Sequence, residues 1–150
     1  MITLIRTESD NQDFRELVKQ LDADLAIRDG SEHEFYAQFN KVDKIKHVVV
    51  AYEDDIPVGC GAIKELTSEA MEVKRMYTIP ASRGKGAASM VLSELERWSA
   101  ELNYKTCRLE TGKKQPEAIA LYLKQNYKII PNYGQYAGVE NSVCFEKSIQ

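Results

Sequence analysis

The sequence has few of the residues that build metal sites and disulfide frameworks. Its 150 residues include two histidines and three cysteines. Cys60, Cys107 and Cys144 are widely spaced, no pair has the spacing of a zinc-binding motif, and each lies in an apolar, strand-like segment. Cysteines in such positions are typical of reduced, buried thiols in a cytoplasmic protein. We therefore expect a cytoplasmic location, no disulfide scaffold and no bound metal.

Long apolar runs and an excess of positive charge are also absent. No run approaches the length of a membrane span, and residues 1–6 form a strand pattern without a secretory cleavage site. The formal net charge of −3 gives no electrostatic basis for binding nucleic acid. A hydrophobic content of 43% excludes disorder, and the chain has no linker or repeat. We expect one α/β domain over residues 1–150, with no nucleic-acid or membrane partner.

Hydrophobic periodicity predicts strands and helices in alternating order. We expect Ser9 to cap the first helix, with Gln12 completing a capping box. The turn between the second and third strands is expected at residues 53–57, and Asn126 is expected to end the last helix in left-handed geometry. The expected strands are residues 2–6, 47–52, 58–66, 71–78, 106–111, 127–130 and 142–147. The expected helices are residues 10–25, 32–39, 84–102 and 116–126.

The most informative segment is a glycine-rich turn between a strand and a helix. Arg83-Gly84-Lys85-Gly86-Ala87-Ala88 follows the extended segment 73–78 and opens an amphipathic helix that runs to about Leu102. The first N–H groups of a helix are exposed and its dipole is positive there, so phosphate binds well. Glycine lets the backbone approach an anion closely, and the turn also carries two cations. The pattern indicates a phosphate site, with an ordinary strand-to-helix turn as the alternative.

Two common phosphate-binding motifs do not match. A Walker P-loop needs a glycine five residues before a Gly-Lys pair, and Cys107 holds that place before Gly112-Lys113. A dinucleotide fingerprint needs a third glycine or alanine where Ser89 stands. Pro80 and three further residues also separate the strand from the glycines, whereas that motif turns tightly out of its strand.

The pattern Arg83-x-x-Gly86-x-Ala88 instead resembles the acetyl-CoA pyrophosphate loop of the GNAT family of N-acetyltransferases. Two further motifs match in order and spacing. Residues 72–77 (Glu-Val-Lys-Arg-Met-Tyr) are similar to the family's fourth strand, and residues 118–127 resemble the helix that ends in its "LY…GF" signature. The match covers residues 47–130 well. It implies a mixed, mostly antiparallel sheet of about six to seven strands with helices on both faces and with strands four and five splayed.

The resemblance implies an enzyme that moves an acetyl group from acetyl-CoA directly to a primary amine. Main-chain groups around residues 76–78 would hold the pantetheine arm and the thioester oxygen. The N–H groups of residues 84–88 would hold the pyrophosphate, with Arg83 or Lys85 near the phosphates. The implied acetyl-CoA-binding residues are Met76, Tyr77, Thr78, Arg83, Gly84, Lys85, Gly86, Ala87 and Ala88.

Three side chains are candidates for proton transfer. By resemblance, Tyr122 would donate a proton to the departing CoA thiolate, because a phenol with a pKa near 10 stays protonated at neutral pH. Tyr122 could instead be only a core residue. Glu72 aligns with a strand-four glutamate that some relatives use as a base, and Glu110 could face the same cleft. Alternatively both belong to a solvated sheet face, with Glu72 paired to Lys74 or Arg75.

The acceptor side is less determined. The loop 132–138, with Tyr133 and Tyr136, suits a pocket wall but also an ordinary hairpin connection. By resemblance, residues 32–39 would form an acceptor lid. Lys113-Lys114 could meet CoA phosphates or be solvated. The acceptor amine is unidentified, and a homodimer is common in the family.

Two alternatives to an enzyme stay open. One is a non-catalytic acyl-CoA-binding module with a protein partner, which would bind CoA without turnover. The other is a nucleotide-binding regulatory domain, which would bind ATP or NAD in place of CoA.

Overall fold

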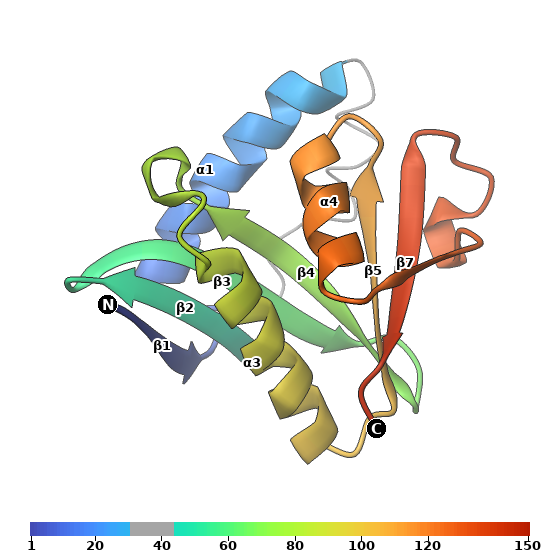
Figure 1. The fold of residues 1–150 in the computed structure, drawn as a ribbon, viewed down its shortest axis with the longest axis horizontal. Helices are drawn as coiled ribbons and strands as arrows, with labels where there is room; N and C mark the ends of the chain where they lie inside the picture. The colour runs from blue at the N-terminus through green and yellow to red at the C-terminus, as the bar shows by residue number, and fades with distance from the viewer. Residues whose placement is uncertain (31–43) are drawn as a thin grey trace.

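The computed structural model describes residues 1–30 and 44–150 (Figure 1), so the helix expected at 32–39 lies outside the described residues. The seven strands described form one sheet in the order β1-β2-β3-β4-β5-β7-β6. Neighbouring strands are antiparallel except β4 and β5, which pair in parallel. The predicted mixed, mostly antiparallel sheet is confirmed.

The observed strands agree with the expected ones to within two residues at either end. They are β1 (Ile2–Thr7), β2 (His47–Glu53), β3 (Ile56–Glu65), β4 (Ala70–Thr78), β5 (Thr106–Gly112), β6 (Lys128–Ile130) and β7 (Ser142–Ser148). The helices are α1 (Gln12–Asp29), α3 (Ala87–Glu101) and α4 (Pro116–Lys124), with 3₁₀ turns η2 (Pro80–Ser82) and η3 (Gly134–Tyr136).

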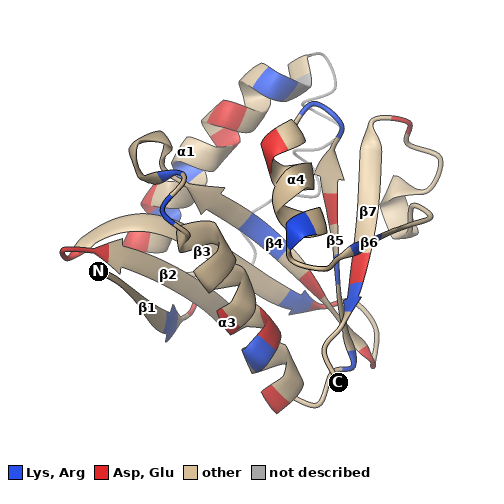
Figure 2. Ribbon diagram, in the orientation of Figure 1, with Lys and Arg blue, Asp and Glu red and all other residues tan. Residues whose placement is uncertain are grey.

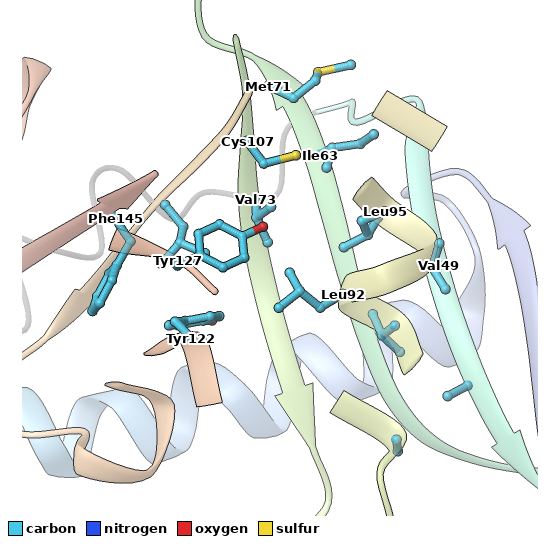
Figure 3. Close-up of a cluster of buried hydrophobic side chains, with 14 of the residues drawn as sticks. Val49, Ile63, Met71, Val73, Leu92, Leu95, Cys107, Tyr122, Tyr127 and Phe145 are labelled. Atoms are coloured by element: carbon cyan, nitrogen blue, oxygen red, sulfur yellow. The ribbon is translucent and has the colours of Figure 1, made fainter. Parts of the chain in front are cut away.

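Helices cover both faces of the sheet, as the sequence predicted. The apolar stripe of α1, which includes Phe14 and Leu17, packs on Val48 and Val50 of β2. Helices α3 and α4 lie on the opposite face, over a larger cluster. Figure 3 shows that cluster, in which side chains of α3 meet the β-sheet beside Tyr122, Tyr127 and Phe145. The core therefore has two parts, one on each side of the sheet.

One local prediction near the start of the chain is wrong. Helix α1 is capped by Asn11, whose side chain accepts a hydrogen bond from the Phe14 N–H at 3.0 Å. Ser9 instead accepts one from the Ile45 N–H through its hydroxyl, at 2.9 Å. Asparagine caps a helix as well as serine does, so pattern alone could not choose between them. The hairpin turn between β2 and β3 lies within the predicted residues 53–57 but is shorter, because Asp54 and Asp55 both adopt left-handed φ angles.

Strand β4 contains a bulge that the sequence did not reveal. Cys60 of β3 pairs with Tyr77, and Ala62, two residues on, pairs with Lys74, so β4 holds one extra residue. Arg75 lies in this stretch with φ of 61°, an uncommon angle for a residue other than glycine. A bulge redirects the side chains that follow it. The direction of Met76 and Tyr77 is therefore set here.

Strands β4 and β5 part in the middle of the sheet. Their register runs from Ala70↔Thr106 through Met71↔Cys107 to Glu72↔Arg108 and ends there. Beyond Glu72 the two strands diverge, as Figure 1 shows. The predicted splay is confirmed. It leaves backbone groups along one edge of β4 without a strand partner on that side, and it opens the sheet between α1 and α4.

Candidate active site

The glycine-rich segment forms a loop between η2 and α3 that is shaped to receive an anion. Gly84 and Gly86 have φ of 84° and 89°, and a Cβ on either would meet no heavy atom within 4 Å. Helix α3 begins at Ala87 rather than at Gly84 as expected, with Gly86 in the capping position. In the described chain, the N–H groups of residues 84–89 donate to no backbone carbonyl, and the first bond of the helix end joins Met90 N to Gly86 O at 3.0 Å. A row of N–H groups without a backbone acceptor, beside open space at Gly84 and Gly86, fits a phosphate group.

A cavity of about 350 Å³, here called the glycine-loop cavity, extends from this loop. Its walls are the end of β4, the loop itself, the start of α3, one side of α4, and Leu21 and Asp24 of α1. All but one of the residues predicted to bind acetyl-CoA line it: Met76, Tyr77, Thr78, Arg83, Gly84, Gly86, Ala87 and Ala88. The exception is Lys85, an exposed residue whose amine lies 3.3 Å from Oε1 of Glu53.

Two cations lie at this cavity. The Nε of Arg83 donates to the Thr78 carbonyl at 3.0 Å, and its guanidinium lies 5.8 Å from the ring centroid of Tyr77. These contacts hold Arg83 against the cavity wall. Lys124, at the end of α4, also lines the cavity and was not predicted, because nothing in its local sequence marks it. Figure 2 marks the basic residues of the loop before α3 and of α4 in blue. Lys113 and Lys114 are exposed and line neither cavity.

A second, smaller cavity of about 110 Å³ adjoins the first, and we call it the carboxylate cavity. It is lined by Glu72, Val73, Lys74, Arg75, Glu110, Thr111, Gly112, Leu25 and Tyr136. The walls shared with the glycine-loop cavity are Leu21, Met76, Gln115, Ala118 and Tyr122. The shared residues come from α1, β4 and the α4 region, so the two cavities meet at the opening between β4 and β5.

The charged side chains of this cavity project from the face of the sheet that α1 covers. Val73 and Leu109 belong to the cluster beneath α3 and α4. Because side chains alternate along a strand, their neighbours Glu72, Lys74 and Glu110 point to the other face. Glu72 and Glu110 therefore stand on the two strands that border the opening. We expected Glu110, near the end of the fifth strand, to face the same cleft as Glu72, and the structure brings both to one cavity.

Tyr122 lies where the two cavities meet. The residue is buried, with its ring centroid 5.9 Å from that of Tyr127 and 5.7 Å from that of Phe145 (Figure 3). Burial raises the pKa of its phenol, and the nearby charge of Glu110 raises it further. The hydroxyl is therefore protonated at neutral pH. Its ring is part of the core, and the residue also lines both cavities, so packing and a cavity-facing role coexist.

Glu72 is held by two polar neighbours and is only 7% exposed, so the alternative of a solvated sheet face is wrong for it. The hydroxyl of Tyr133 donates to its Oε2 at 2.6 Å, and Nζ of Lys74 lies 3.5 Å from its Oε1. Tyr133 comes from the loop before β7, which therefore supports the site. Arg75, the other expected partner, pairs with Asp22 of α1 at 3.1 Å instead.

Glu110 and Tyr136, the second tyrosine of the loop before β7, line the same cavity as Glu72. The Ser142 hydroxyl donates to Oε2 of Glu110 at 2.7 Å. Tyr136 is buried, and its pKa is raised by burial first and then by the charges of Glu110 and Glu72. The negative charges of both Glu72 and Glu110 therefore act on the hydroxyl of Tyr136. Such a cluster attracts a cationic group and can accept a proton from it.

The cysteines do not take part in either cavity, although Cys144 pairs with Glu110 across β5 and β7. Cys60, Cys107 and Cys144 are free and fully buried, and none lines either cavity. Burial raises the pKa of Cys60 to about 12 and that of Cys107 to about 11, so both remain thiols. A cysteine acyl-enzyme is disfavoured as a result. His33, Glu34 and Tyr36 of the expected lid lie outside the described residues. Among the described helices, none is long and apolar enough to cross a membrane.

Comparisons with known proteins agree with this geometry. The family model described as "Acetyltransferase (GNAT) family" matches residues 10–127. The uncharacterized N-acetyltransferase YjgM of Escherichia coli is 32% identical over 127 residues, which are 77% of this chain and 75% of the relative.

Solved structures share the fold along the whole chain. A presumed acyl-CoA N-acyltransferase from Klebsiella pneumoniae superposes with a TM-score of 0.83 at 28% identity, covering 100% of this chain and 99% of that one. The PaiA N-acetyltransferase of Thermoplasma acidophilum, solved in complex with coenzyme A, has a TM-score of 0.72 at 15% identity over 99% of both chains. The protein described here belongs to the GNAT family of acetyltransferases.

Proposed function

We propose that the protein transfers an acetyl group from acetyl-CoA to a primary amine while both substrates are bound. The observation that carries the proposal is the position of Tyr122, which lines two adjoining cavities of different chemistry. One cavity presents main-chain donors and open space to an anion, and the other presents carboxylates to a cation. Burial of all three cysteines supports direct transfer over a covalent enzyme intermediate.

The glycine-loop cavity suits acetyl-CoA, which supplies an activated thioester. The N–H groups of residues 84–88 would hold the pyrophosphate. Gly84 and Gly86 carry no Cβ, so the space beside these N–H groups stays open for the anion. Past Glu72, β4 has no strand partner on the β5 side, so its main chain at residues 76–78 can bind the pantetheine arm and the thioester oxygen. Hydrogen bonds to that oxygen stabilise the negative charge that develops there.

The carboxylate cavity suits the acceptor amine, which must be neutral before it attacks. An ammonium group attracted by Glu72 and Glu110 would lose one proton to a carboxylate, directly or through water. Both oxygens of Glu72 already have a polar partner, Tyr133 or Lys74, so we assign the proton to Glu110 and give Glu72 a binding role. Tyr122 would then protonate the departing thiolate and regain a proton from the newly acylated nitrogen as the tetrahedral intermediate collapses.

Ligand-induced stabilisation tests the cosubstrate. Acetyl-CoA and CoA should raise the melting temperature, because each binds the folded state, whereas ATP and NAD should do so much less. A panel of amines incubated with acetyl-CoA, followed by thiol release, then tests turnover. A larger shift with NAD or ATP would favour a nucleotide-binding domain. Stabilisation by CoA without turnover on any amine would favour a non-catalytic module.

Paired substitutions test the base. Glu110→Gln should lower kcat by about 100-fold or more, the usual scale for a general base. Glu72→Gln should act mainly on KM for the amine, because its proposed contribution is binding. The opposite pattern would make Glu72 the base. Full activity in both variants would contradict the mechanism while leaving the family assignment intact.

A further inference from the structure

The carboxylate cavity contains cations as well as anions. Lys74 and Arg75 of β4 line it together with Glu72 and Glu110. Lys74 lies two residues from Glu72 on the same strand face, with a side chain that is 16% exposed. The Arg75 side chain is 2% exposed and is held by Asp22. Both cations are therefore largely removed from solvent beside the two carboxylates.

This mixture of charges narrows the class of acceptor. A cavity that presented only carboxylates would suit a diamine or polyamine, whose charges are all positive. Here a ligand with positive charge alone would lie beside the Lys74 ammonium, and like charges in a partly buried site repel strongly. A ligand that carries one charge of each sign would complement both sets of side chains. The volume of about 110 Å³ restricts such a ligand to a small molecule.

We propose that the acceptor is a small α-amino acid or a close analogue with a free carboxylate, and that Lys74 binds this carboxylate. The inference rests on the proposed function. The amine would lie between the two carboxylates and Tyr122, where the two cavities meet, and the carboxylate toward the Lys74 ammonium on β4. A lysine ammonium has three donor hydrogens, so it can contact Glu72 and a ligand carboxylate together. The N-terminus of a protein carries no carboxylate beside its amine and is disfavoured.

Matched acceptors test the class directly. Each set contains an amino acid, its carboxamide and the amine that lacks the carboxyl group: L-serine, L-serinamide and ethanolamine, or L-alanine, L-alaninamide and ethylamine. The carboxamide also mimics a protein N-terminus. With saturating acetyl-CoA and thiol release as the readout, kcat/KM for the best amino acid should exceed that of its carboxamide and amine by tenfold or more. Faster turnover of the carboxamides, of the simple amines or of 1,4-diaminobutane would overturn the proposal.

Variants of Lys74 test whether this residue causes the preference for an amino acid over its carboxamide. Lys74→Met should lower kcat/KM for the amino acid at least tenfold, mainly through KM, and should remove its advantage over the carboxamide. Lys74→Arg keeps the charge and should retain most of that advantage. Lys105→Met is the matched control, because Lys105 also has a glutamate near its amine but lines neither cavity. An unchanged amino-acid preference in Lys74→Met would refute the role of Lys74.

Thermal stabilisation by CoA separates this inference from the proposed function. If acetyl-CoA stabilises the protein but no amino acid is acetylated, the acceptor class is wrong and the cosubstrate assignment stands. If acetyl-CoA does not stabilise the protein, the proposed function fails, and the acceptor class fails with it. Stabilisation of the Lys74→Met variant by acetyl-CoA should equal that of the wild type, which shows that the substitution has not disturbed the glycine-loop cavity.

Discussion

The two adjoining cavities are built in different ways. The glycine-loop cavity is formed largely by one continuous stretch, from Met76 to Ser89, which presents main chain and small side chains next to Met76, Tyr77 and Arg83. The carboxylate cavity is assembled from side chains of α1, β4, β5, α4 and η3, which are distant in sequence. Main-chain recognition tolerates changes of side chain and suits a cosubstrate common to a whole family. Side-chain recognition changes with each substitution, so we expect acceptor specificity to lie in the carboxylate cavity.

Tyr122 belongs to both cavities, and its substitution should have the largest effect. Tyr122→Phe keeps the ring that packs on Phe145 and removes the hydroxyl. Loss of the proton donor should lower kcat about 100-fold, while the Kd for acetyl-CoA changes little. Steady-state kinetics and a binding titration measure the two quantities.

Tyr127→Phe is the matched control for that experiment. Tyr127 packs against Tyr122 but donates its hydrogen bond to Glu96, at 3.0 Å, and lines neither cavity. It should lose about 1 kcal/mol of unfolding free energy and keep its kcat. Near-normal turnover in Tyr122→Phe would make Tyr122 a packing residue and assign proton delivery to water.

A negative charge in the glycine loop should weaken CoA binding in the glycine-loop cavity and leave the carboxylate cavity unchanged. Gly86→Asp places a carboxylate where the pyrophosphate is proposed to bind, and CoA affinity should fall at least tenfold, about 1.4 kcal/mol. Gly86→Asn controls for the backbone, because Asn and Asp tolerate the left-handed geometry at this position similarly. The aspartate variant should bind CoA clearly more weakly than the asparagine variant. Equal affinities in folded proteins would locate the phosphates elsewhere.

The bulge in β4 provides a smaller test, because it lies between the two cavities. Asp22→Asn weakens the ion pair with Arg75, whose side chain is buried, although Asp22 itself is 47% exposed. We expect a loss of about 1 kcal/mol in urea unfolding, below the value for a fully buried pair. The Kd for acetyl-CoA should rise modestly, because Met76 and Tyr77 follow the bulge. Asp10→Asn, at an exposed position, should change neither quantity.

His47 should give the smallest effect, and it lies outside both cavities. Its ring packs edge-on against Trp98 at 4.8 Å, and its pKa is lowered by burial first and then by the charge of Lys46, with Glu8 opposing. The folded state therefore favours the neutral ring, and stability is lost as the pH falls through the unfolded-state pKa near 6.5. His47→Gln should show a shallower loss of unfolding free energy between pH 6.5 and 5. Its kcat at pH 7 should be unchanged, because the residue contacts neither substrate site.

The difference between the cavities also explains what could be predicted from sequence. The glycine loop and the strands are local patterns, so their positions followed from spacing and periodicity. Lys124 reaches the same cavity only through the packing of α4, and nothing in its neighbourhood in the sequence marks it. Lys85 has a phosphate-site pattern but contacts Glu53, because the loop directs its side chain away from the cavity.

The acceptor side depends on contacts between distant residues. The hydrogen bond from Tyr133 to Glu72 joins positions 61 residues apart, and no local pattern predicts it. The bulge at Arg75 was also missed, since the sequence there reads as a regular strand and a left-handed φ is unexpected for arginine. The expected proximity of Glu72 and Glu110 combined a resemblance, for Glu72, with the position of Glu110 near the end of its strand. The structure shows it through the pairing of Glu72 with Arg108, two residues before Glu110.

The parting of β4 and β5 has a consequence for amide hydrogen exchange. Strand β4 is central in the order of the sheet, where protection from exchange is normally greatest. Its amides that point toward the opening beyond Glu72 have lost the β5 partner, so they should exchange like those of a sheet edge. The neighbouring amides that bond to β3 should remain slow. An alternating pattern of fast and slow amides along a single central strand would result, and a ligand bound in the opening would be seen as new protection of the fast set alone.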